Sequence, residues 1–228
     1  MNERRLNRVD DGRKNRLYDS STRLAAADLT RRRIREAALR LFLALGYKRT
    51  TVAAIAKRAG VAVDTVYESA GTKVEIFRYL IETAISGGDE ALPALERDYV
   101  RAVRAEPRAA DKLVLYARAI AAIHGRLAPL MMVVREASGD APEIAELWHE
   151  ISERRAANMR MFAEDLCAAG EVRPELGVEA IEDFVWATNS PEFYSLLVTE
   201  RGWTPETFAD WLAETWQRLF LEQTLPAR

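Results

Sequence analysis

The chain has 228 residues, enough for one large domain or two small ones, and its composition (49% hydrophobic, 30% charged) suits a soluble globular protein. No uninterrupted apolar run reaches the roughly 18 to 20 residues that a membrane helix needs. The polar, arginine-rich N-terminus lacks the apolar core of a secretory signal, and the single cysteine, Cys167, excludes an intramolecular disulfide. These features exclude a disulfide scaffold and predict a cytoplasmic protein with no membrane partner.

The formal net charge of −2 hides a strong asymmetry along the chain. Residues 1–73 carry 17 Lys and Arg against 8 Asp and Glu, a net charge of +9, whereas the remainder carries 16 against 27, a net charge of −11. A basic surface neutralises phosphates and releases condensed counterions from DNA. The asymmetry therefore favours DNA binding by the first third of the chain and a different role for the rest.

The first 27 residues are rich in arginine and lack helical apolar periodicity. We interpret residues 1–27 as a basic N-terminal arm that is flexible in the free protein. A second hypothesis is that the arm lies along the DNA backbone or enters a minor groove.

A helix is predicted over residues 29–45, where arginines 31, 32 and 35 lie outside an apolar stripe and Gly46 ends the helix. The stripe consists of Ile34, Ala37, Ala38, Leu41, Phe42 and Leu45.

The stretch from Thr50 to Lys73 has the form of two short helices joined by a tight turn. The apolar residues 52, 55, 56 and 59 form one helical face, Thr50 or Thr51 can cap its start, and Gly60 can end it in a left-handed conformation. A second helix over residues 63–69 places Val66 inward. This pattern predicts a helix-turn-helix, with an ordinary helical hairpin as the alternative.

The next helix is predicted over residues 73–86. Thr72 and Glu75 at its start have the spacing of a capping box.

Residues 30–80 resemble the N-terminal domain of TetR-family transcriptional regulators. The matching segments are TRRRIREAALRLFLALGYKRTTV and IAKRAGVAVDTVYESAGTKVEIF, which share the order and spacing of four helices. The resemblance implies an all-α fold in which an N-terminal three-helix DNA-binding domain is linked by a fourth helix to a helical domain for effector binding and dimerisation. One position departs, because the family usually has a core aromatic residue where this chain has Ala70. We therefore expect altered packing there.

The candidate DNA contacts lie in and beside the helix-turn-helix: Thr51, Ala62, Asp64, Thr65, Tyr67 and Lys73. Thr51 and Lys73 stand at helix starts, where amide groups and a cation favour phosphate. The Tyr67 hydroxyl can reach a phosphate, and Thr65 can reach a base edge. Asp64 and Glu68 either accept from cytosine or are ordinary surface charges.

The chain is expected to divide into residues 1–27, a DNA-binding domain over 28–88 and a C-terminal domain over 89–228. Helices are predicted over residues 94–105, 109–125, 129–138, 142–168, 178–189, 191–200 and 205–223, with breaks at proline and glycine. The last helix has a broad apolar stripe that either completes its own domain or packs against a second copy in a homodimer. That stripe consists of Phe208, Trp211, Leu212, Thr215, Trp216, Leu219 and Phe220.

A small-molecule pocket is predicted among large apolar and aromatic residues that are interspersed with a few polar ones. Its candidates are Tyr116, Ile120, Ile123, Met131, Met132, Arg135, Trp148, Met159, Phe162, Trp186 and Asn189. Each could instead be plain core. Arg135 beside an apolar run must pair, reach water or meet a ligand, and Glu136 or Glu146 are its expected partners. Cys167 is expected to be a small buried hydrophobe. His124 and His149 are too isolated to indicate a metal site.

The sequence and the resemblance together predict a ligand-responsive DNA-binding transcriptional regulator. It would be a repressor released from a palindromic operator by a small molecule, with no cofactor, no metal and no catalytic residues. Two alternatives remain: an architectural protein that binds DNA without sequence preference, and an enzyme that uses the helical cavity.

Overall fold

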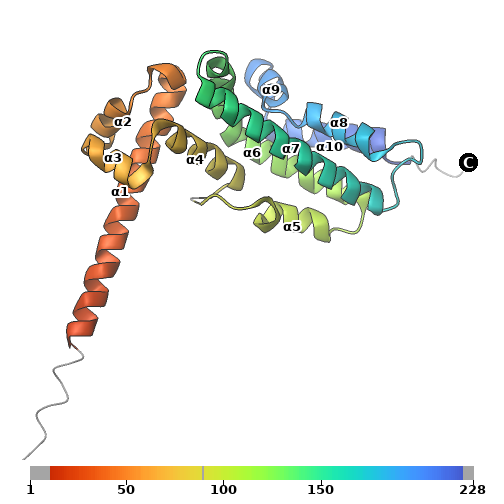
Figure 1. Ribbon diagram of the computed structural model, residues 1–228. Helices are drawn as coiled ribbons and strands as arrows, with labels where there is room; N and C mark the ends of the chain where they lie inside the picture. Colours follow the sequence, from red (N-terminus) through yellow and green to blue (C-terminus); the bar gives the residue numbers. More distant parts are fainter. Residues whose placement is uncertain (1–10, 89, 223–228) are drawn as a thin grey trace, which may run out of the picture. The chain divides into compact units, whose positions relative to one another are not determined.

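The computed structural model describes residues 11–88 and 90–222, with side chains described from Leu24 onward (Figure 1). Within this part every element of regular secondary structure is a helix, and one isolated antiparallel β-bridge joins Val172 and Leu221. The predicted all-α fold is thus confirmed. Contacts divide the chain into two compact units. Unit 1 contains the residues up to Leu45 and Arg49–Phe77, and unit 2 contains Gly46–Lys48 and the residues from Arg78 onward.

Unit 1 consists of three helices and the start of a fourth: α1 (Asp11–Arg49), α2 (Val52–Ala59), α3 (Val63–Ala70) and α4 (Lys73–Ser86). Its core is built from most of the residues that the apolar periodicity predicted, but Leu45 of the predicted stripe is wrong, since it lies beside the end of the first helix and is 37% exposed. Ile34, Phe42, Ile55 and Val66 are each 0% exposed, and the rings of Phe42 and Phe77 lie 4.6 Å apart. Burial of this apolar surface holds the short helices, which would be marginal in isolation.

Helix α1 is longer than predicted, because it begins at Asp11 rather than Leu29. Residues 13–28 lack an apolar stripe, but they contain no glycine or proline and include the strong helix formers of the run 24–27. The predicted end of the first helix is marked by Gly46, which is non-helical with φ 75° inside the assigned range. Residues 1–10 and the side chains of 11–23, which form most of the predicted basic arm, lie outside the described residues.

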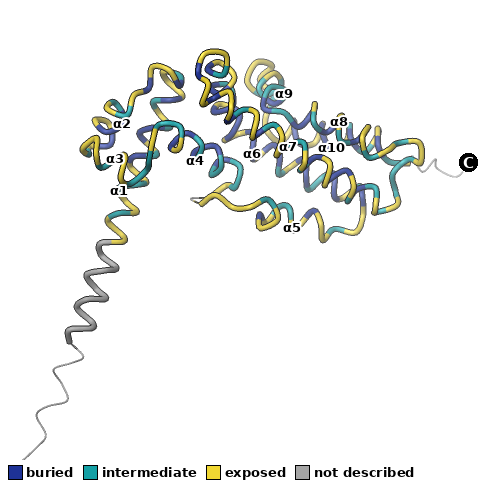
Figure 2. Tube along the Cα trace, viewed as in Figure 1, coloured by how far each residue is buried: buried dark blue, intermediate teal, exposed yellow. Residues whose placement is uncertain are grey.

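Unit 2 is a bundle centred on α6, which packs against α5, α7, α9 and α10. Figure 2 shows buried residues of this unit recurring along α6 and along neighbouring helices such as α7. Its elements after α4 are η1 (Ala94–Glu96), α5 (Asp98–Ala105), α6 (Ala109–Ser138), α7 (Pro142–Ala168), α8 (Val178–Thr188), α9 (Pro191–Tyr194), the π-helical η2 (Ser195–Glu200) and α10 (Pro205–Phe220).

The predicted break near residues 127–129 is wrong, since α6 runs without interruption through Pro129. A proline inside a helix costs about 3 kcal/mol, because it lacks the N–H donor and crowds the preceding turn. Leu127, Leu130 and Met131 around it are 2 to 7% exposed. Burial of each such side chain contributes about 1.5 to 3 kcal/mol, which together outweighs the proline penalty.

Helix α6 is also long and apolar enough to cross a membrane by length and composition alone. The sequence did not predict a segment of this length here, because charged residues such as Arg126 interrupt the apolar run. Of its most apolar 18-residue window, 61% is buried inside the structure, as is common for the core helix of a soluble protein.

Helix α10 contributes most of its apolar stripe to its own unit. Phe208, Leu212 and Trp216 are 0% exposed, whereas Trp211 and Leu219 are 36% and 39% exposed. The helix ends at Phe220 rather than residue 223, because Leu221 pairs with Val172 and the backbone N–H of Arg173 donates to the Phe220 carbonyl.

Candidate DNA-reading surface and ligand cavity

The turn between α2 and α3 in unit 1 has the predicted helix-turn-helix geometry. The Thr51 hydroxyl accepts from the Ala54 amide at 3.1 Å and so caps α2. Gly60 adopts φ 68°, and its amide donates to the Ala56 and Lys57 carbonyls. A Cβ atom at Gly60 would lie 2.8 Å from Nη2 of Arg33, which itself donates to the Ala59 carbonyl at 2.5 Å. Both the backbone conformation and the space therefore favour glycine at this turn.

Helix α3 presents most of the candidate DNA contacts on its surface. Val66 is 0% exposed and anchors the helix in the core. Ala62, Asp64 and Tyr67 are exposed, and Thr65 is partly exposed. The Tyr67 ring is half exposed rather than packed, which leaves its hydroxyl free to move. Contact with DNA by these residues, by Thr51 and by the partly exposed Lys73 remains a prediction.

The step between α3 and α4 is held by the predicted capping box. Oε2 of Glu75 accepts from the Thr72 amide at 2.7 Å and from the Thr72 hydroxyl at 2.8 Å, and that hydroxyl accepts from the Glu75 amide. The bond from the Thr72 backbone lowers the pKa of the Glu75 carboxyl. Gly71 precedes the box with φ 84°. Ala70 is partly exposed at the end of α3, and the expected packing difference there remains a prediction.

Unit 2 contains a cavity of about 780 Å³ of empty space, part of which is open to solvent. We call it the arginine-lined cavity, because Arg97, Arg154 and Arg155 line it. Seven of the predicted pocket residues also line it: Tyr116, Ile120, Ile123, Met131, Trp148, Met159 and Asn189. A concave site with apolar walls and a few polar groups suits a small-molecule ligand.

Four predicted pocket residues lie elsewhere. Phe162 lines a neighbouring pocket, and neither Met132 nor Trp186 lines either one. The Arg135 side chain is 64% exposed and pairs with Glu192 at 3.4 Å rather than with Glu136 or Glu146. Arg135 belongs to the last turn of α6, where a cation is favourable and its long side chain reaches water.

A buried hydrogen-bond network joins three side chains that line the arginine-lined cavity. Nδ2 of Asn189 donates to the Tyr116 hydroxyl at 2.9 Å, and Oδ1 of Asn189 lies 2.9 Å from Nε2 of His124. With the amide in this orientation, Nε2 of His124 carries the proton and Nδ1 is an acceptor. That Nδ1 atom is buried and has no hydrogen-bond partner within the described residues. Burial lowers the pKa of His124 to about 4, so the ring is neutral at pH 7.

Arg155 was missed by the sequence analysis. Its Nε and Nη2 atoms donate to the Asn189 carbonyl at 3.1 and 2.6 Å, Nη2 also donates to the Trp186 carbonyl, and the guanidinium lies 3.9 Å from the centroid of the Trp186 ring. The cation thereby caps the C-terminal end of α8. Helical periodicity could have found it, because Arg155 follows Trp148 by seven positions and precedes Met159 by four, on one face of α7.

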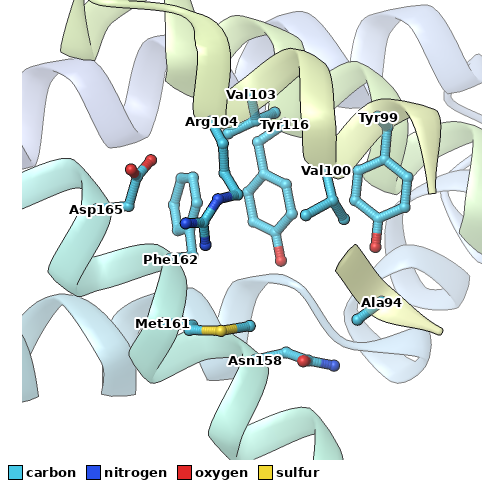
Figure 3. Close-up of a pocket in the computed structure, with 10 residues that line it drawn as sticks. All are labelled: Ala94, Tyr99, Val100, Val103, Arg104, Tyr116, Asn158, Met161, Phe162 and Asp165. Carbon is cyan, nitrogen blue, oxygen red and sulfur yellow. The ribbon is translucent and has the colours of Figure 1, made fainter. Parts of the chain in front are cut away.

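A smaller neighbouring pocket of about 480 Å³ lies beside α5 and shares Tyr99, Tyr116 and Asn158 with the arginine-lined cavity (Figure 3). The Tyr116 ring stacks on Phe162 with centroids 4.1 Å apart. Asp165, which Figure 3 shows at the edge of this α5 pocket, forms an ion pair with Nζ of the buried Lys112 at 2.7 Å. Carboxylate and cation therefore neutralise each other here.

Two further predictions concern reactive and metal-binding groups. Cys167 is partly exposed rather than fully buried, and the burial it does have raises the pKa of its thiol. In the part of the chain that the structure describes, no three His, Cys, Asp or Glu side chains are grouped so that they could hold a metal ion.

Residues 34–80 match the family model of bacterial regulatory proteins of the tetR family. A search of curated proteins found no match.

Several solved structures resemble most of the chain in fold. The repressor NalD of Pseudomonas aeruginosa superposes with a TM-score of 0.65 at 19% identity, covering 85% of this chain and 98% of that one. The regulator FadR of Bacillus subtilis, in complex with stearoyl-CoA, has a TM-score of 0.63 at 20% identity and covers 80% and 95%. A protein of Saccharomonospora viridis in complex with choline has a TM-score of 0.62 at 20% identity and covers 85% and 98%.

Proposed function

We propose that this chain, whose residues 34–80 match the TetR-family model, is a DNA-binding transcriptional regulator whose DNA affinity responds to a small molecule. The observation that carries the proposal is the presence of two kinds of site in two units. Unit 1 has a capped helix-turn-helix with an exposed α3 surface, and unit 2 has an arginine-lined cavity with apolar walls.

The DNA-reading role rests on helix α3. Its inner residue Val66 is fixed in the core, so the exposed side chains of α3 are presented on a rigid element that fits a major groove. Thr51 and Lys73 stand at the starts of α2 and α4, where they would contact phosphate. Thr65 and Tyr67 would contact a base edge and a phosphate, respectively.

We infer that the protein acts as a homodimer. The exposed apolar residues Leu196, Trp211 and Leu219 of unit 2 support a partner surface that includes α10. Two copies of α3 would then enter successive major grooves about 34 to 36 Å apart on a roughly palindromic operator. Mass measurement in solution at micromolar concentration tests this step, and a monomer would contradict it.

The effector acts by population shift. A ligand that prefers a conformation with the wrong separation of the two α3 helices lowers operator affinity, typically by about 1 to 3 kcal/mol of coupling. Helix α4 starts in unit 1 and continues in unit 2, so a tilt of its C-terminal end would be carried into the DNA-reading helices. Repression is the mode that we infer, because NalD, a structure of similar fold, is named as a repressor. A cytoplasmic location and release from the operator by the effector are part of the same proposal.

The ligands in two structures of similar fold differ in charge. Choline is a cation with a small body, and stearoyl-CoA is an anion with a long acyl chain. The three charged side chains that line the cavity are all arginines, so the cavity favours an anionic ligand.

The DNA contacts can be tested with two variants. Lys73→Ala should weaken binding to specific and random DNA alike, because it removes a phosphate contact. Thr65→Ala should instead change the preference at one base position. Equal losses on random DNA for both variants, measured by fluorescence anisotropy at fixed salt, would show that these assignments are wrong.

A second candidate is an architectural protein that binds DNA without sequence preference. The net charge of +9 in residues 1–73 would suffice for such binding. The cavity in unit 2 has no role in that account, and we therefore favour the regulator. We do not propose an enzyme, because among the described residues that line the cavity no hydroxyl is hydrogen-bonded to His124 or to a carboxylate.

A further inference from the structure

The charged groups of the arginine-lined cavity are unevenly neutralised. Arg154 pairs with Glu82 at 2.6 Å and its side chain is about half exposed, so its charge is already balanced. Arg97 and Arg155 form no ion pair with a carboxylate among the described residues. Instead, Nε of Arg97 donates to the Leu92 carbonyl at 3.1 Å, and Arg155 donates to the carbonyls of residues 186 and 189.

Both of these arginines are withdrawn from water. Arg97 is 6% exposed, and burial is the main reason that the pKa of Arg155 is lowered. A buried cation that meets only main-chain carbonyls is less well compensated than one paired with a carboxylate. The neighbouring α5 pocket shows the compensated arrangement, since its buried Lys112 has Asp165 as partner.

The described residues that line the arginine-lined cavity include no Asp or Glu. Its walls are aromatic and aliphatic, with Tyr116, Ile120, Met131 and Trp148 among them. His124 adds a buried Nδ1 acceptor with no partner within the described residues. The lining thus combines two buried cations without an ion-paired carboxylate, although Glu192 lies near enough to Arg155 to raise its pKa slightly, with an apolar surface and one open acceptor.

We propose that the effector of this site is an amphipathic carboxylate. Its carboxylate is bound by Arg97 and Arg155, its aromatic or aliphatic body lies against the apolar wall, and ligands that carry a hydroxyl place it at Nδ1 of His124. Arginine binds carboxylates with charge-assisted hydrogen bonds, which accounts for the choice of this residue type. The inference rests on the proposed ligand-responsive function and names the chemical class of its ligand.

The test compares ligands that share a body and differ in charge. We would titrate the full-length protein with 3-phenylpropionate, 3-phenylpropionamide and 3-phenylpropylamine, and with decanoate, decanamide and decylamine, following the heat of binding. At least one acid should bind with a Kd below about 1 mM, about 10- to 100-fold tighter than its amide, because a hydrogen bond to a charged group is lost in the amide. The amines should bind more weakly still.

Two variants connect this preference to the named residues. Arg97→Met should reduce the ratio of acid to amide affinity by at least about tenfold without affecting the cap of α8. Arg155→Lys keeps a cation near the α8 carbonyls but loses the planar fork, and should reduce the ratio less. Arg118→Met is the matched control, since Arg118 is exposed on α6 and does not line the cavity, and it should leave the ratio unchanged.

The inference is overturned if an amide or amine binds as tightly as its acid, if no acid binds at about 1 mM, or if Arg97→Met and Arg155→Lys both leave the ratio unchanged. The proposed regulatory function is read separately, as the change in DNA affinity on adding the bound acid. An acid that binds through Arg97 and Arg155 but leaves DNA affinity unaltered would contradict the regulator and not the ligand class.

Discussion

The polar contacts that shape the functional surfaces differ between the two units in how far apart along the sequence the joined residues lie. In unit 1 the contacts that set the helix-turn-helix, Thr51 with Ala54 and Thr72 with Glu75, join residues three positions apart, and the bond from Arg33 to Ala59 spans 26. In unit 2 the cavity network joins His124 to Asn189 and Tyr116 to Asn189 across 65 and 73 positions, and the ion pair at the α5 pocket joins Lys112 to Asp165 across 53.

This difference predicts how many hydrogen bonds a single substitution should remove in each unit. A change in unit 1 removes one cap or one turn conformation, and its neighbours keep their partners. A change at Asn189 in unit 2 leaves several buried groups unsatisfied at once, because its side chain bonds to both His124 and Tyr116.

Asn189→Ala should lower the free energy of unfolding by about 3 kcal/mol, because it leaves Nε2 of His124 and the Tyr116 hydroxyl buried without their partner. Urea unfolding measures the change. Asn158→Ala is the control, since Asn158 lines the same cavity without a hydrogen bond to another described residue, and it should cost less than about 1 kcal/mol. Equal losses for both variants would argue against the network.

Acidification should destabilise unit 2 through His124. Its pKa is about 4 in the folded state against 6.5 in the unfolded state, so the unfolded chain binds more protons between these values. The stabilisation is fully present above about pH 6.5 and is lost as the pH falls towards 4, by up to about 3 kcal/mol.

His124→Gln removes this contribution and should flatten the pH dependence of the unfolding free energy in that window. His149→Gln is the matched control, because His149 is exposed with Glu153 as its partner, and it should retain the wild-type slope. A wild-type slope in His124→Gln would mean that another group controls acid stability.

Gly60→Ala should cost about 1 to 2 kcal/mol, because an L-residue is strained at φ 68° and its Cβ would press on Arg33. Gly139→Ala is a suitable control, since Gly139 is helical and a Cβ there meets nothing within 4 Å. Thermal unfolding that shows no loss for Gly60→Ala would mean that the turn relaxes into another conformation.

Thr51→Ala should have the smallest effect, about 1 kcal/mol, because it removes a single N-cap bond to Ala54. Thr51→Ser keeps the hydroxyl and should restore most of the stability. If serine fails to restore it, the methyl group of Thr51 rather than the cap supports α2.

The same difference in reach explains what could be predicted from the sequence. The Gly60 turn and the Thr72–Glu75 box are local, and spacing alone was sufficient to place them, whereas it left the cap of α2 open between Thr50 and Thr51. The partner of Arg135 and the role of Arg155 depend on residues 57 and 34 positions away, where spacing carries no information about contacts. The break at Pro129 was wrong because tertiary burial outweighed a local penalty.

The central claim is that unit 1 reads a specific DNA sequence. Selection of binding sites from a random duplex library, followed by affinity measurement at fixed salt near 150 mM, tests it most directly. If unit 1 reads a specific sequence as part of a dimer, we expect an enriched inverted repeat with half-sites about one helical turn apart. This repeat should be bound at least about 10³-fold more tightly than random DNA. A library without an enriched motif, bound as tightly as random DNA, would contradict the claim and favour architectural binding.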